Sequence, residues 1–297
     1  NNKSIIEKEE TNNINFIYYD LPSFFTKIKK KLPLGTQLYY LLWQWGAYFY
    51  LRNFIKKSNL NFDIIHHLNF SISWLTPPSF LLNLPLVWGP IGGGDFIPLQ
   101  FLRRMKFIAI LNECFYYLIN QLNKFSPFSF LIRKSMSAVI FRTESAKKSY
   151  NFKKKDIIYG VISETAFSGN IFKKEKLDSS FINAICVGRM TYWKGFLLAV
   201  KGFHMFLDNG GNGRLELYGN GPEFKVIEDY IKKNHLEKKI LLKGFVDNDV
   251  INESLKKSTI LIHPSFRDGG SWSVMEAMSN GLPVICLDTS GLKDMVS

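Results

Sequence analysis

Cysteine is scarce in this chain, and its cysteines form no motif. Cys114, Cys186 and Cys286 are the three cysteines among 297 residues, and they lie far apart. This spacing excludes a disulfide-rich secreted scaffold, and no Cys-x-x-Cys or Cys/His cluster indicates a metal site. Cys186 and Cys286 fall in apolar runs typical of buried strands. We therefore predict structural thiols in a reducing, cytoplasmic compartment and no bound metal.

Long uninterrupted apolar runs are also missing. The segment Leu32–Leu51 is uncharged and aromatic, but proline, glycine and glutamine interrupt it. Counted from Leu38, the run is shorter than the roughly 20 apolar residues that a membrane span needs. We expect a buried or interfacial helix instead. The polar, charged stretch Asn1–Thr11 does not resemble a signal peptide.

Acidic residues are outnumbered, since Lys and Arg total 38, Asp and Glu total 25, and the formal net charge is +13. No Arg-rich arm or zinc-finger spacing accompanies this charge, which argues against a nucleic-acid partner. Biased genome composition, an anionic ligand and an anionic membrane surface all remain open explanations. Basic side chains that would suit lipid head groups, if they are not simply a solvated face, are Lys27, Lys29–Lys31, Arg103, Arg104 and Lys106.

Segments of strand length alternate with helical patterns along the chain, and 46% hydrophobic residues suffice for a sizeable core. The expected strands are 14–19, 62–66, 84–88, 138–143, 156–162, 184–187, 214–218, 240–242, 259–263 and 284–287. The expected helices are 38–57, 101–124, 193–207, 222–234, 248–257 and 271–281. This alternation predicts an α/β fold of parallel βαβ units.

A polar, charged segment, Asn170–Ser180, interrupts this rhythm and resembles a linker. We therefore predict two domains, residues 1–167 and residues 168–297. The last helix has barely begun at Ser297, and the first strand lacks the partners that normally precede it in a doubly wound sheet. We interpret both domains as incomplete.

The stretch from Phe266 to Ile285 carries the most chemical information. Asp268 stands before Gly269, Gly270 and Ser271, where a short helix is expected to begin. On a helical wheel Val274, Met275 and Met278 share one stripe and Glu276 falls off it, so Glu276 is not core filling. Two acids beside a helix N-terminus, which attracts anions, predict a site for a phosphorylated, hydroxyl-rich ligand.

Glycine turns follow three other predicted strands, at the strand ends where open α/β sheets bind ligands. Gly188, Arg189 and Lys194 follow the strand 184–187; the arginine fork and the lysine charge both suit phosphate oxygens. The alternative is an ion-paired arginine and a solvated lysine. Gly219 and Gly221 follow the next strand, where a plain turn is the alternative. Phe245 and Val246 come after the third, where main-chain groups could contact a base.

In this order the motifs Gly-Arg-x4-Lys-Gly, Tyr-Gly-x-Gly-Pro, Gly-Phe-Val and Asp-x7-Glu-Ala-Met-x-x-Gly-Leu-Pro-Val-Ile resemble the donor domain of family 4 retaining glycosyltransferases. The likeness covers about Ala184–Val296, and it implies the GT-B fold, with two Rossmann-like domains whose parallel sheets face each other across a cleft.

The resemblance also implies roles. Arg189 and Lys194 would bind the diphosphate of a nucleotide-sugar, Glu276 the ribose hydroxyls, and the Gly269–Ser271 amides the phosphates. Asp268 stands where relatives carry a glutamate that faces the donor sugar, and the shorter side chain is a departure. Fixed cations at the leaving diphosphate make a metal unnecessary. The Asp247-x-Asp249 pattern resembles a metal motif, but we predict a helix cap there.

The N-terminal half resembles the same family more loosely. Asp63-Ile-Ile-His66-His67 is similar to its Asp-x-x-His strand end, and the run from Trp88 to Asp95 resembles a subgroup that assembles bacterial surface polysaccharides. His67, Gly93 and Asp95 are candidates for contacting the acceptor or sugar. Strand-end histidines held by backbone hydrogen bonds are the alternative, and His263 is expected to be structural.

The resemblance therefore implies a metal-independent hexosyltransferase that moves a sugar, with retention, from a nucleotide-diphosphate donor to a glycan or lipid-linked acceptor. It would act in the cytoplasm or on the inner face of the cell membrane, in polysaccharide or lipopolysaccharide synthesis, without a cofactor. A sugar-nucleotide epimerase of the same fold and a catalytically decayed nucleotide-sugar-binding protein remain alternatives. No Gly-x-Gly-x-x-Gly supports a dinucleotide oxidoreductase.

Overall fold

A computed structural model describes residues 14–25, 35–58, 60–68, 75–103, 105–150, 157–163 and 180–296. The chain forms two compact units, residues 1–63 with 77–84 and residues 64–76 with 85–297. Several expectations fall outside the described residues: Arg104, Lys27, Lys29–Lys31 and the linker up to residue 179. The domain boundary between residues 167 and 168 also lies there and stays a prediction.

The first unit is built on a long aromatic helix, α3 (Gly35–Lys57), with a short 3₁₀ helix, η1 (Pro78–Leu82). This confirms the helix predicted for 38–57. The strand predicted for 14–19 is wrong, because Tyr19 packs its ring against Trp43 and Tyr50 of α3 instead of joining a sheet. Its carbonyl accepts a hydrogen bond from Trp43 Nε1 at 3.1 Å. None of the described helices is both long and apolar enough to cross a bilayer.

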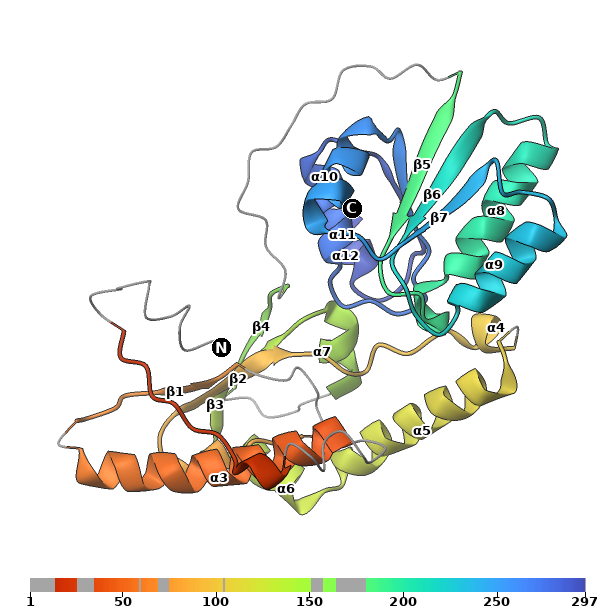
Figure 1. Cartoon of the computed structure of the whole chain (residues 1–297). Coiled ribbons are helices and arrows are strands. Elements are labelled where there is room, and N and C mark those ends of the chain that lie inside the picture. The colour runs from red at the N-terminus through yellow and green to blue at the C-terminus, as the bar shows by residue number, and fades with distance from the viewer. Residues whose placement is uncertain are drawn as a thin grey trace. The chain divides into compact units, whose positions relative to one another are not determined.

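The second unit contains two parallel sheets (Figure 1). The first has the order β1-β2-β3-β4, formed by Ile65–His67, Leu86–Ile91, Met136–Phe141 and Ile158–Val161. The second has the order β7-β6-β5-β8-β9. Its strands are β5 (Ile182–Val187), β6 (Gly213–Tyr218), β7 (Ile240–Gly244), β8 (Ile260–His263) and β9 (Val284–Cys286). The predicted α/β fold with parallel strands is confirmed.

Four helices accompany the first sheet: α4 (Leu99–Leu102), α5 (Phe107–Lys124), α6 (Pro127–Ser135) and α7 (Glu144–Tyr150). The single helix predicted for 101–124 is wrong, because α4 ends at Leu102 and Lys106 adopts an extended backbone before α5 begins. The helices α6 and α7 were not predicted.

The second sheet alternates with η2 (Tyr192–Lys194), α8 (Phe196–Asp208), α9 (Phe224–Lys233), α10 (Asn248–Lys257), α11 (Trp272–Ser279) and α12 (Leu292–Val296). Figure 1 shows α8 and α9 on one face of this sheet and α10, α11 and α12 on the other. The central strand β5 is therefore buried on both faces. Ala184 and Cys186 join the core cluster beneath α8 and α9, while Ile185 and Val187 join the opposite one.

Helix α11 buries a different stripe from the one predicted. Val274 and Ala277 are fully buried, whereas Met278 is 39% exposed. The wheel was wrong because Ala277, rather than Met278, shares the buried face of α11 with Val274. Glu276 is half-buried, which confirms that it lies off the core.

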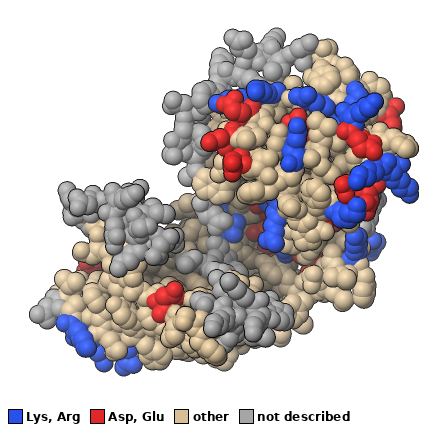
Figure 2. Space-filling model, viewed as in Figure 1, with Lys and Arg blue, Asp and Glu red and all other residues tan. Residues whose placement is uncertain are grey.

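Charged side chains are mixed on the face shown in Figure 2, where Lys and Arg alternate with Asp and Glu over the part of the surface nearest α8 and α9. On α9, Lys225 Nζ lies 2.9 Å from Glu228 Oε2 and 3.0 Å from Asp229 Oδ1. Such exposed pairs contribute little to stability. These pairs cancel in the net charge, so they do not account for the basic excess.

Candidate functional site

The turns after β5, β6 and β7 are tied together at the carboxyl edge of the second sheet. The Gly188 amide donates to the Tyr218 carbonyl at 3.0 Å, and the Met190 amide donates to the Asn220 carbonyl at 2.9 Å. The Gly219 amide donates to the Gly244 carbonyl at 2.7 Å. The predicted glycine turns are therefore neighbours in one loop cluster.

Two of these glycines are required by close backbone approach. A Cβ at Gly219, whose φ is +124°, would lie 1.9 Å from the Gly188 carbonyl oxygen. A Cβ at Gly221 would lie 2.5 Å from the Met190 carbonyl oxygen. No side chain fits at either position without moving the neighbouring turn.

Lys194, Asp268 and His263 form a buried polar group that joins the turns after β5 and β8. The ammonium group of Lys194 donates to Asp268 Oδ2, and His263 Nε2 lies 2.9 Å from the same oxygen. His263 ends β8 and is 3% exposed, and Asp268 is 8% exposed. The two turns touch closely, since a Cβ at Gly195 would lie 2.1 Å from the Pro264 carbonyl oxygen.

The electrostatics of this group keep Asp268 ionised. Burial alone would raise the pKa of Asp268, but the hydrogen bond with His263 and the charge of Lys194 outweigh it and lower the pKa below its usual value. His263 extends the network, because its Nδ1 lies 3.5 Å from Ser273 Oγ. Both ring nitrogens of His263 therefore have a hydrogen-bond partner, which fits a structural role. One of these partners, Asp268, is itself a predicted site residue.

The turn from Gly269 to Ser271 leads into α11. The Ser271 amide donates to Met295 Sδ at 3.4 Å, and Ser271 Oγ lies 2.9 Å from Ser273 Oγ. The Asp268 carbonyl accepts from the Gly291 amide at 2.9 Å. These bonds fix the start of α11 beside Asp268.

Glu276 lies in the second turn of α11, where burial raises the pKa of its carboxyl group. Arg189 is exposed on the turn after β5. Among the described residues, no hydrogen bond or ion pair links Arg189 or Glu276 to the Lys194–Asp268 pair. Phe245 is 83% exposed, while Val246 packs against the core. Asp247 occupies the N-cap position of α10, as predicted, without a side-chain cap bond.

Two residues that follow β3 of the first sheet lie against the turns at Gly269 and Gly291. A Cβ at Gly269 would lie 2.6 Å from Arg142 Nη2, and one at Gly291 would lie 2.7 Å from Thr143 Cγ2. Thr143 Oγ1 donates to Asp95 Oδ1 at 3.2 Å. Asp95 is buried, and that burial raises the pKa of its carboxyl group although Thr143 and Arg142 oppose the shift. Arg142 and Thr143 follow β3 and were not predicted as site residues.

A second missed group lies around Glu113 of α5. Its buried carboxylate accepts from Tyr192 Oη at 2.7 Å and from Arg267 Nη1 at 3.0 Å. The Arg267 guanidinium also lies over the rings of Tyr116, at 4.5 Å, and Trp193, at 5.6 Å. Glu113 therefore connects the two turns that carry Lys194 and Asp268. The one available sequence signal was a lone acid in the middle of an apolar helical pattern whose other charged residues are basic and lie near its ends.

The N-terminal candidates lie at the ends of β1 and β2. His66 Nε2 lies 3.0 Å from the Gly89 carbonyl oxygen, so this histidine has the backbone bond proposed as the alternative. His67 is half-buried. Gly93 has a φ of +98°, a conformation that favours glycine.

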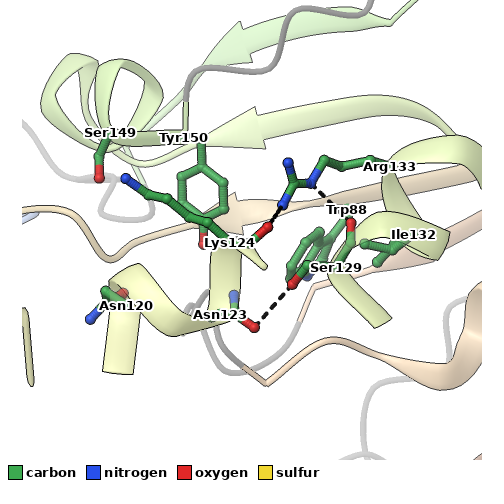
Figure 3. A pocket seen from close by; sticks show the side chains of 9 residues that line it. All are labelled: Trp88, Asn120, Asn123, Lys124, Ser129, Ile132, Arg133, Ser149 and Tyr150. Carbon is green, nitrogen blue, oxygen red and sulfur yellow. Dashed lines mark hydrogen bonds between the residues drawn. The ribbon is translucent and has the colours of Figure 1, made fainter. Parts of the chain in front are cut away.

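A small cavity lies elsewhere in this unit (Figure 3). It has a volume of ≈ 20 Å³, is lined by residues of β2, α5, α6 and α7, and includes none of the predicted site residues. Arg133 Nε donates to the Ser129 carbonyl at 3.0 Å on its wall. A space of this size holds about one water molecule, not a nucleotide. In the described ranges, no group of three His, Cys, Asp or Glu residues is placed to hold a metal ion.

Comparisons with known proteins find matches to the part of the chain that forms the second sheet and its helices. Residues 167–297 match the family model described as glycosyl transferases group 1. The poly(glycerol-phosphate) alpha-glucosyltransferase of Bacillus subtilis is 28% identical over 161 residues, 52% of this chain and 23% of that protein. Protein CapJ of Staphylococcus aureus is 29% identical over 168 residues, 55% of this chain and 42% of that protein. The chain thus spans less than half the length of these relatives.

Two solved structures are similar over most of the chain. Anabaena HepE in complex with UDP and glucose has a TM-score of 0.60 and 17% identity, covering 99% of this chain and 72% of that one. The pneumococcal O-GlcNAc transferase GtfA in complex with UDP and GlcNAc has a TM-score of 0.55 and 16% identity, covering 85% and 47%. At these identities the likeness concerns the fold, and it confirms the predicted GT-B class.

Proposed function

We propose that this chain, whose residues 167–297 match the glycosyl transferases group 1 model, transfers a sugar from a nucleotide-diphosphate donor. The acceptor would be a hydroxyl group of a glycan or of a lipid-linked glycan, and the anomeric configuration would be retained. Membership of family 4 and a role in surface-polysaccharide assembly belong to the same proposal. The names of the relatives given above support that role.

The observation that carries the proposal is the position of Lys194 at the start of α8. A lysine there is unfavourable beside the positive end of the helix dipole unless an anion is also present. Within the described chain that anion is Asp268, whose carboxylate pairs with Lys194. Gly195, rather than a capping side chain, precedes α8 and leaves its first amides available. A diphosphate suits this combination of a cation and a helix N-terminus.

The proposed chemistry breaks the bond between the anomeric carbon and the diphosphate oxygen. An acceptor hydroxyl oxygen forms the new bond, and its proton passes to the departing diphosphate. The transition state resembles an oxocarbenium ion, and negative charge grows on the leaving group. Lys194 and Arg189 would stabilise that charge without a metal ion. Arg189 is exposed and would have to turn toward the donor.

The remaining candidate residues would contact either the nucleotide-sugar donor or the acceptor. Glu276 would accept hydrogen bonds from the ribose hydroxyls, and the turns at Gly188, Gly219 and Gly269 would lie against the donor. Asp268, held ionised, would face the sugar only by exchanging its hydrogen bonds with Lys194 or His263. Asp95 and the neighbouring Gly93 would lie on the acceptor side, and His67 is a weaker candidate for the same side. A cytoplasmic site of action belongs to this proposal.

Calorimetric titration with UDP and UDP-glucose tests the proposal, with Lys194→Met as the variant. Loss of one charged hydrogen bond of about 1.5–3 kcal/mol predicts roughly 10- to 100-fold weaker binding. Lys201→Met is the matched control, since Lys201 is an exposed lysine on the same helix α8. Equal affinity of the Lys194→Met variant and the wild type would overturn the role of Lys194.

Product analysis separates the remaining alternatives. Incubation with UDP-glucose and a glycan acceptor should yield UDP and an extended glycan. An isomerised nucleotide-sugar in the absence of acceptor would show an epimerase instead. Binding without turnover across UDP-, GDP- and ADP-sugars would show a decayed binding protein.

A further inference from the structure

Helix α5 exposes a continuous apolar stripe. Its residues Ile108, Leu111, Phe115, Leu118, Leu122 and the following Phe125 recur at intervals of three and four, and each is at least 51% exposed. That spacing places them on one face of the helix. Phe130 on α6 is a further large apolar residue, and it is 68% exposed. We call these residues, together with Phe107, the α5–α6 surface.

The opposite face of α5 is anchored, so the direction of the stripe is fixed. Ala109, Glu113 and Asn120 are the buried residues of this helix. Glu113 is bound by Tyr192 and Arg267, as described above. The helix cannot rotate the stripe inward without breaking that buried ion pair.

The exposed charge that the α5–α6 segment itself carries has one sign, although Lys106 also interacts with Glu223 at the start of α9. Between residues 99 and 135 the sequence contains one acid, Glu113, and six bases, Arg103, Arg104, Lys106, Lys124, Arg133 and Lys134. The acid is buried and paired, whereas Arg103, Lys106 and Lys134 are exposed, at the two ends of the stripe. An occupant must therefore bury large apolar side chains and also supply negative charge at both ends.

We propose that the α5–α6 surface docks on an anionic lipid bilayer. An amphipathic helix of this kind lies in the interface with its apolar face among the acyl chains, while basic side chains meet the head groups. A second copy of the chain fits less well, because it would bring the same positive charge against the first. The helix lies on the bilayer and does not cross it. The inference is independent of the proposed transfer reaction, although a lipid-linked acceptor would be reached from such a position.

Co-sedimentation of the whole chain with vesicles tests this inference. We expect binding to vesicles of phosphatidylcholine with 30% phosphatidylglycerol, weakened by added salt, and much less to pure phosphatidylcholine. The triple variant Leu111→Ser/Leu118→Ser/Leu122→Ser should bind the anionic vesicles at least 10-fold more weakly. The control Leu198→Ser/Met205→Ser removes exposed apolar side chains from α8 and should bind like the wild type.

Charge and orientation have their own tests. Lys106→Glu/Lys134→Glu should also weaken binding at least 10-fold, without changing the apolar stripe. Cys114 is exposed on α5, and Cys186 is buried, so a Cys286→Ser protein can be labelled at Cys114 with an environment-sensitive dye. Its emission should shift to the blue on anionic vesicles.

The inference is overturned if the wild type does not bind, or if the stripe variant binds as the wild type does. It is also overturned if the dye stays in water while the protein sediments with vesicles, since another face then makes the contact. A dimer in sedimentation equilibrium that the stripe variant dissociates, with no vesicle binding, would assign the surface to a second copy. Circular dichroism and UDP titration of each variant show whether the fold and the donor site are retained.

Discussion

Removing the carboxylate of Glu113 tests how the two turns of the site are held. Glu113 accepts one hydrogen bond from Tyr192, two residues before Lys194, and one from Arg267, next to Asp268. Glu113→Ala removes both bonds and leaves the Arg267 guanidinium without its ion-pair partner. Glu113→Gln keeps an oxygen that can accept from Tyr192 but removes the charge.

The expected cost follows from burial. Breaking a buried ion pair by removing one partner costs about 3–5 kcal/mol. The Arg267 side chain is 20% exposed, so water partly compensates it. We therefore expect Glu113→Ala to lower the free energy of unfolding by about 3 kcal/mol, and Glu113→Gln by about 1.5–2 kcal/mol, at the low end of the range for a lost hydrogen bond to a charged group. UDP affinity should fall in both variants, because the turns carrying Lys194 and Asp268 lose their common support.

Urea unfolding gives the stability change as a shift of the midpoint at constant slope. A double-mutant cycle with Arg267→Met, which keeps contact with the rings of Tyr116 and Trp193, isolates the pair. Residues in direct contact should show an interaction energy of about 1–3 kcal/mol. Additive effects within about 0.5 kcal/mol, or unchanged UDP affinity in Glu113→Ala, would refute the coupling between α5 and the two turns.

Three further predictions concern the donor turns. Gly219→Ala should cost several kcal/mol in urea unfolding, because its Cβ would overlap the Gly188 carbonyl, whereas Gly202→Ala, with open space at its Cβ within α8, should stabilise by about 0.5–1 kcal/mol; a similar cost for both would be contrary evidence. Burial raises the folded-state pKa of Glu276, so stability falls as pH rises through that pKa. Glu276→Gln should therefore raise Tm at pH 7, converge with the wild type below about pH 4, and weaken UDP binding; a lower Tm at pH 7 would contradict this. The folded-state pKa of Asp268 is lowered, so its contribution is present above its unfolded pKa of about 3.9 and is lost as pH falls through the folded value. The stability gap between wild type and Asp268→Asn should shrink below about pH 4, and a gap that widens there would contradict the shift.

The strands and helices after residue 180 were predictable because local pattern and packing agree. The central strand β5 is a short apolar run buried on both faces, and helices such as α8 and α9 have one apolar face, so periodicity separates strand from helix. The predictions for the strand 14–19 and the helix 101–124 were wrong for physical reasons. Tyr19 belongs to an aromatic cluster with Trp43 and Tyr50, and such packing has no period in sequence. The segment between α4 and α5 also contains no proline or glycine that would predict an interruption of the helix.

The sequence predicted those parts of the candidate site that directly follow a strand along the chain. Glycines after strands must lie at one sheet edge, and the bonds between Gly188, Gly219 and their neighbours agree with that expectation. The pairing of Glu113 with Tyr192 and Arg267 joins residues 79 and 154 positions apart. No local pattern encodes which distant side chain a buried acid will meet. Arg142 was missed for the same reason.

The ion pair between Lys194 and Asp268 has a consequence for exchange of the donor. The protein supplies its own counter-ion, so the ammonium group stays ordered while the site is empty. Under the proposed function, an incoming diphosphate would compete with that carboxylate, and part of its Coulomb attraction would be offset by the bond it displaces. The same carboxylate would pair with Lys194 again as the nucleotide leaves, which would favour turnover over tight retention of the nucleotide.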